Sequence, residues 1–389
     1  MLSKSLKKEL TILSSIAAGI LFLGSKRKTA ALFGIGAAYL YFSKEELKSL
    51  KGKSIIITGG SRGLGLALAR DLVKEKAKVT IIARDQMELD AAEKELQDIN
   101  SQLEEAELAE VFAIKCDITS EFELGLAFLK VEDKFGRIDV LINNAGSICV
   151  GPFESMEIED FEAQMNLHVY SVIKATKLII PFFKKYHEGH IVNISSIGGK
   201  IPVPHMSTYS ASKFALAGFA SSVAPELALL GIKMTNVFPG LMRTGSPIQA
   251  VFKGDHAKEF SLFSLGDMMP GISVSAEFAA KTILEAVKTG DSQVLVSSPA
   301  KIANFAYSNF PEVFNTILKL TAKLMPQGQS LVRKTGAKTR RDMHKTGFDK
   351  IFNLASQVIE DKMNQMEKDN AEFNLNIKET QEHDPKTNP

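Results

Sequence analysis

The sequence predicts an α/β protein in which a doubly wound sheet of seven parallel strands occupies residues 51–300. Short runs rich in Ile and Val recur along this region, and stretches with helical spacing of apolar residues separate them. This alternation is typical of a parallel sheet with helices on both faces. A glycine-rich segment directly after the first run is the third observation, because the first turn of a Rossmann-type fold needs such a segment.

The strands are expected in chain order, each followed by a helical stretch, with no internal repeat and no linker between them. Their β-branched runs cover 54–58, 78–83, 111–115, 140–143, 190–195, 233–237 and 293–296.

The composition excludes several classes of protein. Lys and Arg number 47 against 45 Asp and Glu, so the net charge of +2 gives no support to a nucleic-acid partner. The cysteines, Cys116 and Cys149, have neither disulfide-framework nor zinc spacing, which indicates a reducing compartment. No metal is expected, and four histidines are interpreted as structural or surface residues: His168, His187, His190 and His205.

Residues 1–50 are predicted to be a membrane-associating segment. Residues 10–24 and 29–42 are uncharged, and a basic cluster lies between them. Each is shorter than the roughly 20 residues that span a bilayer, so one tilted span, a shallow hairpin and an interfacial anchor all stay open. A cleaved signal peptide and a soluble amphipathic arm are the alternatives. The basic cluster favours a catalytic domain on the cytoplasmic side of the membrane.

A helical extension is expected over residues 301–368 and a disordered tail over 369–389. The basic residues between 333 and 350 suit either anionic lipid headgroups or a solvated loop. Apolar residues at helical spacing predict an amphipathic helix over 351–367 that packs on the body.

The glycine-rich segment after the first strand is a candidate phosphate-binding loop. Glycines allow a tight turn and a close approach of backbone to a pyrophosphate, and the start of the following helix favours an anion. A turn with only a packing role is the alternative. The expected cofactor contacts are Thr58, Gly59, Ser61, Arg62, Gly63, Leu64 and Gly65.

The end of the second strand indicates which nucleotide binds. Ala83 stands where a carboxylate would bind the ribose hydroxyls of NAD, and Arg84 follows it. Arg84 and Arg62 can hold a 2′-phosphate through their forked donors, which favours NADP(H). Asp117 either accepts from the adenine amine or caps a turn.

Four separated motifs resemble those of the short-chain dehydrogenase/reductase (SDR) family. Residues 58–65 resemble its TGxxxGxG loop, 143–146 its NNAG motif, 209–213 its YxxxK motif and 239–240 its PG pair. The resemblance covers residues 51–300 and implies a nicotinamide cofactor, with further contacts from Asn143, Ala145, Gly146, Tyr209, Lys213, Pro239, Gly240 and Thr244.

The resemblance also implies a catalytic set of Asn166, Ser196, Tyr209 and Lys213, with Ser195 as the near alternative to Ser196. Reduction of a carbonyl needs a proton donor, and Tyr209 fits that role. Lys213 lies one helical turn away and is expected to lower the pKa of the phenol. Ser196 would hold the substrate oxygen, and Asn166 would hold a water that connects Lys213 to solvent.

The stretch 241–275 is expected to cover the substrate. Its apolar, methionine-rich composition suits a lipophilic substrate such as a steroid, retinoid, long-chain acyl or sphingoid ketone. Ordinary packing is the alternative for its lid residues Phe252, Phe260, Phe263 and Met268.

Two other functions stay open: a reductase of 3-oxoacyl groups on a carrier protein, and a membrane-anchored NADPH-binding scaffold or sensor without turnover. By resemblance, the chain is expected to form a homo-oligomer through helices near residues 155–185 and 207–230.

Overall fold

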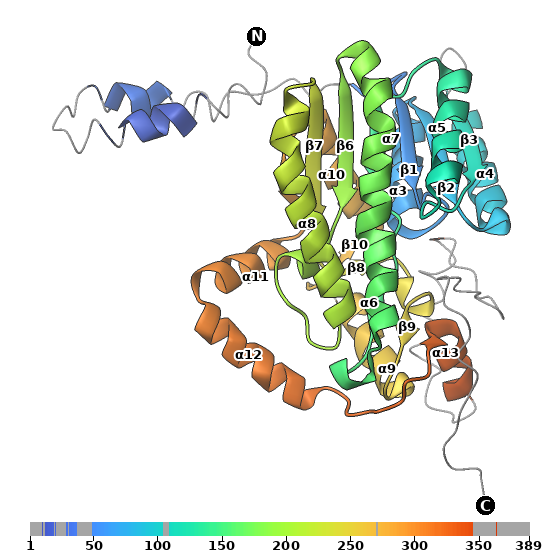
Figure 1. The fold of residues 1–389 in the computed structure, drawn as a ribbon, viewed down its shortest axis with the longest axis vertical. Helices are drawn as coiled ribbons and strands as arrows, with labels where there is room; N and C mark the ends of the chain where they lie inside the picture. Colours follow the sequence, from blue (N-terminus) through green and yellow to red (C-terminus); the bar gives the residue numbers. More distant parts are fainter. Residues whose placement is uncertain are drawn as a thin grey trace, which may run out of the picture.

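The computed structural model describes most of the chain between residues 49 and 344. The described residues are 10, 12–18, 20, 29, 31–36, 49–103, 109–269, 271–344 and Met363. Figure 1 shows a central sheet with helices packed on both of its faces and a helical arm that leaves the body after the last strand.

Seven parallel strands form the sheet in the order β11-β7-β6-β4-β1-β2-β3. The strand order reverses between β1 and β4, as in other doubly wound sheets. The strands are β1 (Ser54–Thr58), β2 (Lys78–Ala83), β3 (Glu110–Lys115), β4 (Val140–Asn143), β6 (Gly189–Ile194), β7 (Ile232–Phe238) and β11 (Gln293–Leu295). The prediction of a seven-stranded parallel sheet is therefore confirmed, with strand ends that differ by one or two residues.

Alternation along the strands builds two cores. Ile55 and Ile57 of β1 point into one core and Ile56 into the other, because successive side chains of a strand face opposite sides. The first core receives α3 (Gly63–Lys74), α4 (Gln86–Ser101) and α10 (Ala276–Thr289). The second receives α5 (Glu121–Phe135), α7 (Ser171–Tyr186) and α8 (Ser207–Ala228).

Segments beyond the carboxyl edge of the main sheet form two small sheets that the sequence did not predict. Strand β9 (Val251–Phe252) lies between β5 (Cys149–Val150) and β12 (Lys334–Thr335), and β8 (Met242–Arg243) pairs with β10 (Val274–Ser275). Helices α6 (Ile158–Met165) and α9 (His256–Met268) complete this layer, with the π-helical turn η3 (Asn166–Tyr170) joining α6 to α7.

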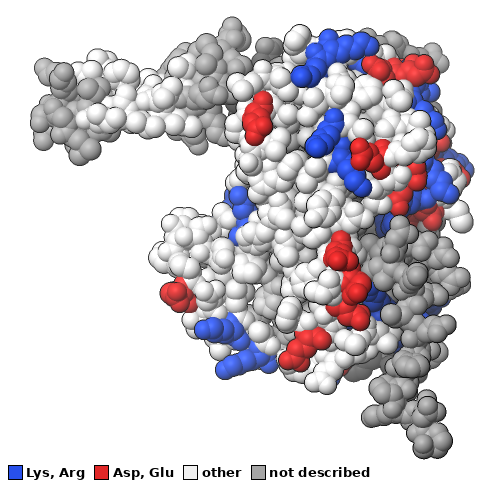
Figure 2. All heavy atoms as spheres, viewed as in Figure 1, with Lys and Arg blue, Asp and Glu red and all other residues white. Residues whose placement is uncertain are grey.

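Three helices follow the last strand of the main sheet: α11 (Ser298–Asn309), α12 (Pro311–Leu324) and, after β12, α13 (Gly336–His344). Helix α12 has no buried residue, and its exposed apolar side chains include Val313, Ile317, Leu320 and Leu324. In Figure 1 this arm projects from the body below α8, and Figure 2 shows that the same part of the surface carries few charges.

The expectation of a membrane-associated protein is corrected. Among the residues that the structure describes, no helix is both long and apolar enough to cross a membrane. The described helical stretches near the N-terminus cover only residues 12–18 and 31–36. No N-terminal apolar anchor is therefore shown, and the uncharged stretches of the sequence were too short a basis for that prediction.

The predicted helix 351–367 and the predicted tail 369–389 lie outside the described residues, except for Met363. Met363 is buried in the first core, and its carbonyl oxygen accepts a hydrogen bond from Gly63 N–H at 3.0 Å. One residue of the C-terminal region thus contacts the start of α3.

Candidate active site

The carboxyl ends of β1, β4, β6 and β7 lie side by side at one edge of the sheet. In open α/β sheets, ligands bind at this edge, where the strand order reverses. The topology therefore brings together residues from four separated sequence motifs: Thr58, Asn143, Ser196 and Pro239 each follow or end one of these strands.

The loop after β1 has room only for glycine at the positions nearest the strand. Gly59 and Gly63 have positive φ angles of 65° and 55°. A Cβ on Gly65 would lie 2.1 Å from Gly59 O, and a Cβ on Gly59 would lie 2.9 Å from Ala145 Cα. The N-cap, Arg62, makes no side-chain capping bond to the α3 N-terminus, which begins with Gly63 and the buried Leu64. The backbone of this cradle suits a dinucleotide phosphate, but the first amide of α3, Gly63 N–H, donates to Met363 O at 3.0 Å in this structure.

Asn144 holds this loop to the end of β4, although it was not among the expected site residues. Its Nδ2 donates to Thr58 O and Gly59 O, both at 3.0 Å. Thr58 Oγ1 in turn accepts from the amides of Asn144 at 3.0 Å and Ala145 at 3.2 Å. The sequence did contain a signal for Asn144, because it is a second polar residue directly after the buried strand β4. Asn143 is different, because its Nδ2 donates to Asn193 Oδ1 at 2.9 Å within the sheet.

The two arginines at the adenosine end have different surroundings. Arg62 Nη1 is 2.8 Å from Oε1 of the buried Glu88, whose other oxygen accepts from Ser61 Oγ at 3.3 Å. Arg84 is exposed and has no ion-pair or hydrogen-bond partner among the described residues. Arg84 is therefore the guanidinium that is available to an anion, whereas Glu88 neutralises Arg62.

Asp117 forms a turn. Its Oδ1 accepts from Thr119 N at 2.9 Å and from Thr119 Oγ1 at 2.8 Å. Asp117 Oδ1 therefore caps a turn, which was the alternative to a contact with the adenine amine.

The two serines after β6 have separate tasks. Ser195 is buried, and its Oγ donates to Lys213 O at 3.1 Å, which fixes α8 to the sheet. Ser196 Oγ accepts from Gly198 N at 3.0 Å, and the Ser196 side chain is close enough to Tyr209 to oppose the rise in the pKa of its phenol. Ser196 is thus the serine that faces the tyrosine.

The electrostatics of Tyr209 and Lys213 correct one expectation. Burial raises the pKa of Tyr209 to about 12, with the Ser196 side chain acting in the opposite direction and the charge of Asp267 adding to the increase. Burial also lowers the pKa of Lys213 to about 7. Lys213 Nζ donates to Ile194 O at 3.0 Å and lies 5.7 Å from the centre of the Tyr209 ring. Burial thus dominates the pKa of Tyr209, and it acts against the direction expected from a neighbouring ammonium.

Among the described residues, no hydrogen bond links Asn166 to the other three residues of the expected catalytic set, so its role stays a prediction. Its side chain is exposed at the end of α6 and has no hydrogen bond within the described part of the chain. His168, two residues later, is buried between Ser147 and Ser212 and lies edge-on to Tyr209. The only sequence signal for His168 was a polar residue in an apolar stretch.

The residues after β7 close the site from the other side. Pro239 O accepts from Ile197 N at 2.7 Å, which links the PG pair to the Ser196 turn. A Cβ on Gly240 would lie 2.8 Å from Ser297 Oγ. Thr244 is buried, with its Oγ1 at 3.4 Å from Ser246 N.

Three of the four expected lid residues pack on one another. The ring centres of Phe252 and Phe260 are 5.6 Å apart, and those of Phe252 and Phe263 are 6.0 Å apart. Phe252 and Phe260 are buried, and Met268 is half-buried at the end of α9. The packing alternative thus applies to the phenylalanines. Other apolar side chains of the same segment are exposed: Leu262, Leu265, Met269 and Ile272.

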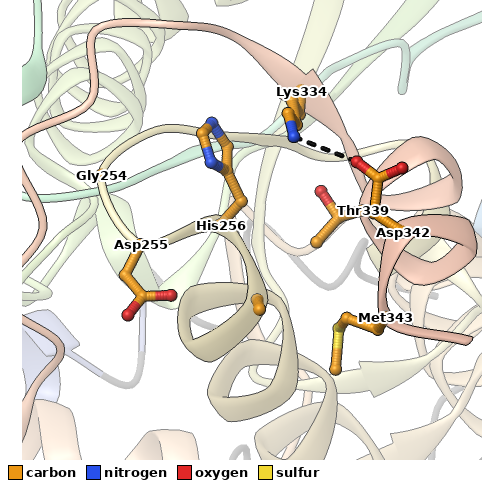
Figure 3. Close-up of a pocket in the computed structure, with 8 residues that line it drawn as sticks. Gly254, Asp255, His256, Lys334, Thr339, Asp342 and Met343 are labelled. Carbon is orange, nitrogen blue, oxygen red and sulfur yellow. Dashed lines mark hydrogen bonds and ion pairs between the residues drawn. The ribbon is translucent and has the colours of Figure 1, made fainter. Parts of the chain in front are cut away.

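A separate pocket of about 410 Å³ lies between the start of α9 and α13. Figure 3 shows Asp255 and His256 on one side, and Lys334, Thr339 and Asp342 on the other. Lys334 Nζ is 3.0 Å from Asp342 Oδ2, so these charges compensate each other. None of its lining residues belongs to the candidate site, and we assign the chemistry to the carboxyl edge of the sheet.

Comparison with known proteins identifies the family. The model of the short chain dehydrogenase family matches residues 53–251, about half of the chain. This chain belongs to the short-chain dehydrogenase/reductases. It is therefore an SDR oxidoreductase, and the match ends before α9 and the helical arm.

One relative and two solved structures illustrate the similarity. The 3-ketodihydrosphingosine reductase of Dictyostelium discoideum is 33% identical over 284 residues, 70% of this chain and 83% of the relative. A metagenomic short-chain oxidoreductase in complex with NADP is 28% identical, with a TM-score of 0.51 and coverage of 64% of this chain and 98% of the other. A Burkholderia phymatum SDR in complex with NAD is 20% identical, with a TM-score of 0.60 and coverage of 68% and 96%, and shows the fold alone.

Proposed function

We propose that this SDR is an NADP(H)-dependent oxidoreductase that interconverts a carbonyl and an alcohol on a lipophilic substrate. The observation that carries the proposal is the contact of Ser196 with Tyr209, beside Lys213, next to a phosphate-binding cradle. A proton donor, a second hydroxyl and a cation beside a nucleotide site are what a carbonyl reductase needs.

The side chains divide the work of carbonyl reduction. The bound nicotinamide supplies the hydride. Tyr209 is protonated at neutral pH, as a phenol with an ordinary pKa near 10 also is, and burial raises its pKa further to about 12. Its hydroxyl is the proposed donor of the proton that the developing alkoxide requires. Ser196 holds the substrate oxygen with a second hydrogen bond. Lys213 is protonated below its pKa of about 7, and its proposed role is to bind the ribose hydroxyls of the nucleotide.

The preference for NADP(H) depends on Ala83 and Arg84. No carboxylate stands at the end of β2 to repel a 2′-phosphate, and the exposed Arg84 can bind one. Glu88 neutralises Arg62 and reduces its contribution. The solved relatives contain either NADP or NAD, so this preference depends on the residues of this chain.

The lipophilic substrate is supported by the surface of the segment after β7. Four apolar side chains of α9 and the following turn are exposed: Leu262, Leu265, Met269 and Ile272. An exposed apolar patch beside a catalytic edge suits a long hydrocarbon chain. The Dictyostelium relative is named for a sphingoid ketone, which is a substrate of this class.

The experiment is to measure oxidation of NADPH and NADH with ketones of increasing chain length, using wild type and Tyr209→Phe. We expect NADPH-dependent turnover that rises with chain length, and a kcat about 10²- to 10⁴-fold lower in Tyr209→Phe. NADPH affinity should remain within about twofold of wild type. NADPH binding without turnover of any ketone would contradict the proposal and favour a nucleotide-binding scaffold.

A further inference from the structure

His168 lies at the only π-helical turn among the described residues. This turn, η3, separates α6 from α7, and wide turns of this kind are frequent at functional sites. His168 is 1% exposed. The wide turn leaves Asn166 on the surface and directs the imidazole two residues later into the protein.

The hydrogen bonds of His168 define a single tautomer. Ser147 N–H donates to Nε2 at 3.1 Å, and a backbone amide can only donate, so Nε2 is the unprotonated nitrogen. Nδ1–H then donates to Ser212 Oγ at 2.8 Å, and Ser212 Oγ donates to Tyr209 O at 2.8 Å. Burial and the charge of Lys213 hold the pKa of His168 well below its ordinary value, in agreement with a neutral ring.

These bonds join the two walls of the candidate site. Ser147 directly follows the NNAG motif, and Gln164 Nε2 also holds its Oγ at 2.8 Å. Ser212 lies on α8, between Tyr209 and Lys213 in sequence. The imidazole is thus hydrogen-bonded to the loop on one side and to the catalytic helix on the other.

The imidazole also lies against the catalytic groups themselves. Its centre is 5.6 Å from that of the Tyr209 ring, at an interplanar angle of 89°. A Cβ on Gly146 would lie 3.0 Å from His168 Nε2 and 3.7 Å from Lys213 Nζ, so both nitrogens flank the same backbone atom. The imidazole ring of His168 therefore separates the Gly146–Ser147 loop from helix α8, and its width sets the distance between them.

We propose that His168 is a positioning residue: its neutral imidazole sets the distance between the Gly146–Ser147 loop and α8 and thereby orients Tyr209 and Lys213. The family resemblance gives Asn166, two residues earlier, a place in the same site, so the two residues are compared in the test. The kinetic part of this inference rests on the proposed function, whereas its nucleotide-binding part does not.

The test compares His168→Phe with His190→Phe. Phenylalanine keeps a ring against Tyr209 but removes both hydrogen bonds. His190 is a matched control, because it is also buried, its Nε2 is 2.8 Å from Thr235 Oγ1, and it begins β6 at the far end of the strand from Ser196. Both variants are expected to lower Tm to a similar extent.

In His168→Phe we expect kcat to fall about 10- to 100-fold with KM for the ketone within about threefold of wild type. The dissociation constant of the nucleotide, measured by NADPH fluorescence, should rise about three- to tenfold. His190→Phe should change neither quantity by more than about twofold. His168→Asn, which keeps a donor toward Ser212, and His168→Gln, which keeps an acceptor for Ser147, should each lose less kcat than His168→Phe.

The inference would be overturned if the two phenylalanine variants lost the same Tm and also had the same kcat and the same nucleotide affinity. His168 would then only stabilise the fold, as His190 does. A larger loss of kcat in Asn166→Ala than in His168→Phe would return the role to Asn166. If wild type turns over no ketone, the proposed function fails. The nucleotide affinities of the two phenylalanine variants then decide the role of His168.

Discussion

Helices α5 and α12 are almost the same length and are both amphipathic, yet only one is buried. Helix α5 buries Leu124, Ala127, Phe128, Val131 and Phe135 in the second core. Helix α12 buries no residue and exposes an apolar face. The exposed helix α12 has the stronger amphipathic pattern of the two, so weaker periodicity does not explain its exposure, and the difference comes from their place in the chain.

The place of each helix in the topology decides what it can cover. Helix α5 connects β3 to β4, and a crossover between parallel strands must pack on a face of the sheet. Helix α12 follows β11, and the next strand, β12, pairs with β9 in a small sheet, so α12 is not a crossover between strands of the main sheet. Helical periodicity therefore predicts a helix with an apolar face, and the topology supplies the surface for that face.

A Leu→Ala substitution in each of the two helices should give the largest difference in the free energy of unfolding. Leu124→Ala in α5 is expected to lower the free energy of unfolding by about 2–5 kcal/mol, because Leu124 is fully buried. Leu320→Ala in α12, where the side chain is 57% exposed, should change it by less than about 0.5 kcal/mol. Urea unfolding measures both. A loss above 1 kcal/mol in Leu320→Ala would mean that α12 is covered in solution.

A second comparison uses glycines on α3 and α5. Gly65→Ala is expected to weaken nucleotide binding about 10- to 100-fold, because its Cβ would overlap Gly59 O at 2.1 Å and Asn144 Nδ2 at 2.6 Å. Gly125→Ala should instead stabilise the protein by about 0.5–1 kcal/mol, since the nearest atom to its Cβ is 3.9 Å away. Titration with NADPH and thermal unfolding check these results. Unchanged affinity in Gly65→Ala would exclude this loop as the phosphate site.

The exposed charge at the end of β2 should have a smaller and more selective effect. Arg84→Ala is expected to raise the dissociation constant of NADPH about tenfold and to leave that of NADH within about twofold. Arg62→Ala should have less effect on NADPH, because Glu88 already pairs with Arg62. Equal losses for both nucleotides in Arg84→Ala would contradict an NADP(H) preference that depends on this residue.

Helix α9 is intermediate between the largely covered α5 and the uncovered α12, because it exposes apolar residues and also buries the acid Asp267. Burial raises the pKa of Asp267 to about 7, and the Ser246 hydrogen bond opposes this. Between about pH 4 and 7 the folded state therefore holds a proton that the unfolded state has lost, so stability falls as pH rises through this window. Asp267→Asn removes that dependence, and its Tm should exceed wild type by about 2–4 °C at pH 7.5 but not at pH 4. A Tm difference that does not vary with pH would contradict the raised pKa.

Sequence patterns predicted the sheet and the glycine loop well because both depend on local chemistry. Ile55, Ile56 and Ile57 had to be buried on both faces, and Gly59 and Gly65 had to be glycine to avoid backbone overlap. The spacing of Tyr209 and Lys213 on one helix likewise placed them together. In each of these cases, the physical requirement involves residues that are close together in the sequence.

The sequence could not predict features that depend on a helix register or on distant contacts. The π-helical turn directs His168 inward, and ordinary helical spacing did not predict its contacts with Ser147 and Ser212. The pKa of Tyr209 depends on burial from several elements, which spacing along one helix does not show. Phe252 of β9 packs on Phe260 and Phe263 of α9. Strand β9 pairs with the distant strand β5, and no local sequence pattern predicted that small sheet.

The contact between Met363 and the start of α3 has a consequence for synthesis of the chain. Arg70 Nη1 lies 3.9 Å from Met363 Sδ, and the two residues are 293 positions apart. At about 5–20 residues per second, roughly 15–60 s pass between their emergence from the ribosome. During that interval the sheet can form, but the Gly63 amide has to bond water or another acceptor. The last strand of the main sheet, β11, ends 68 residues before Met363, so a nascent chain can complete this sheet only about 3–14 s before the first turn of α3 has all of its final partners.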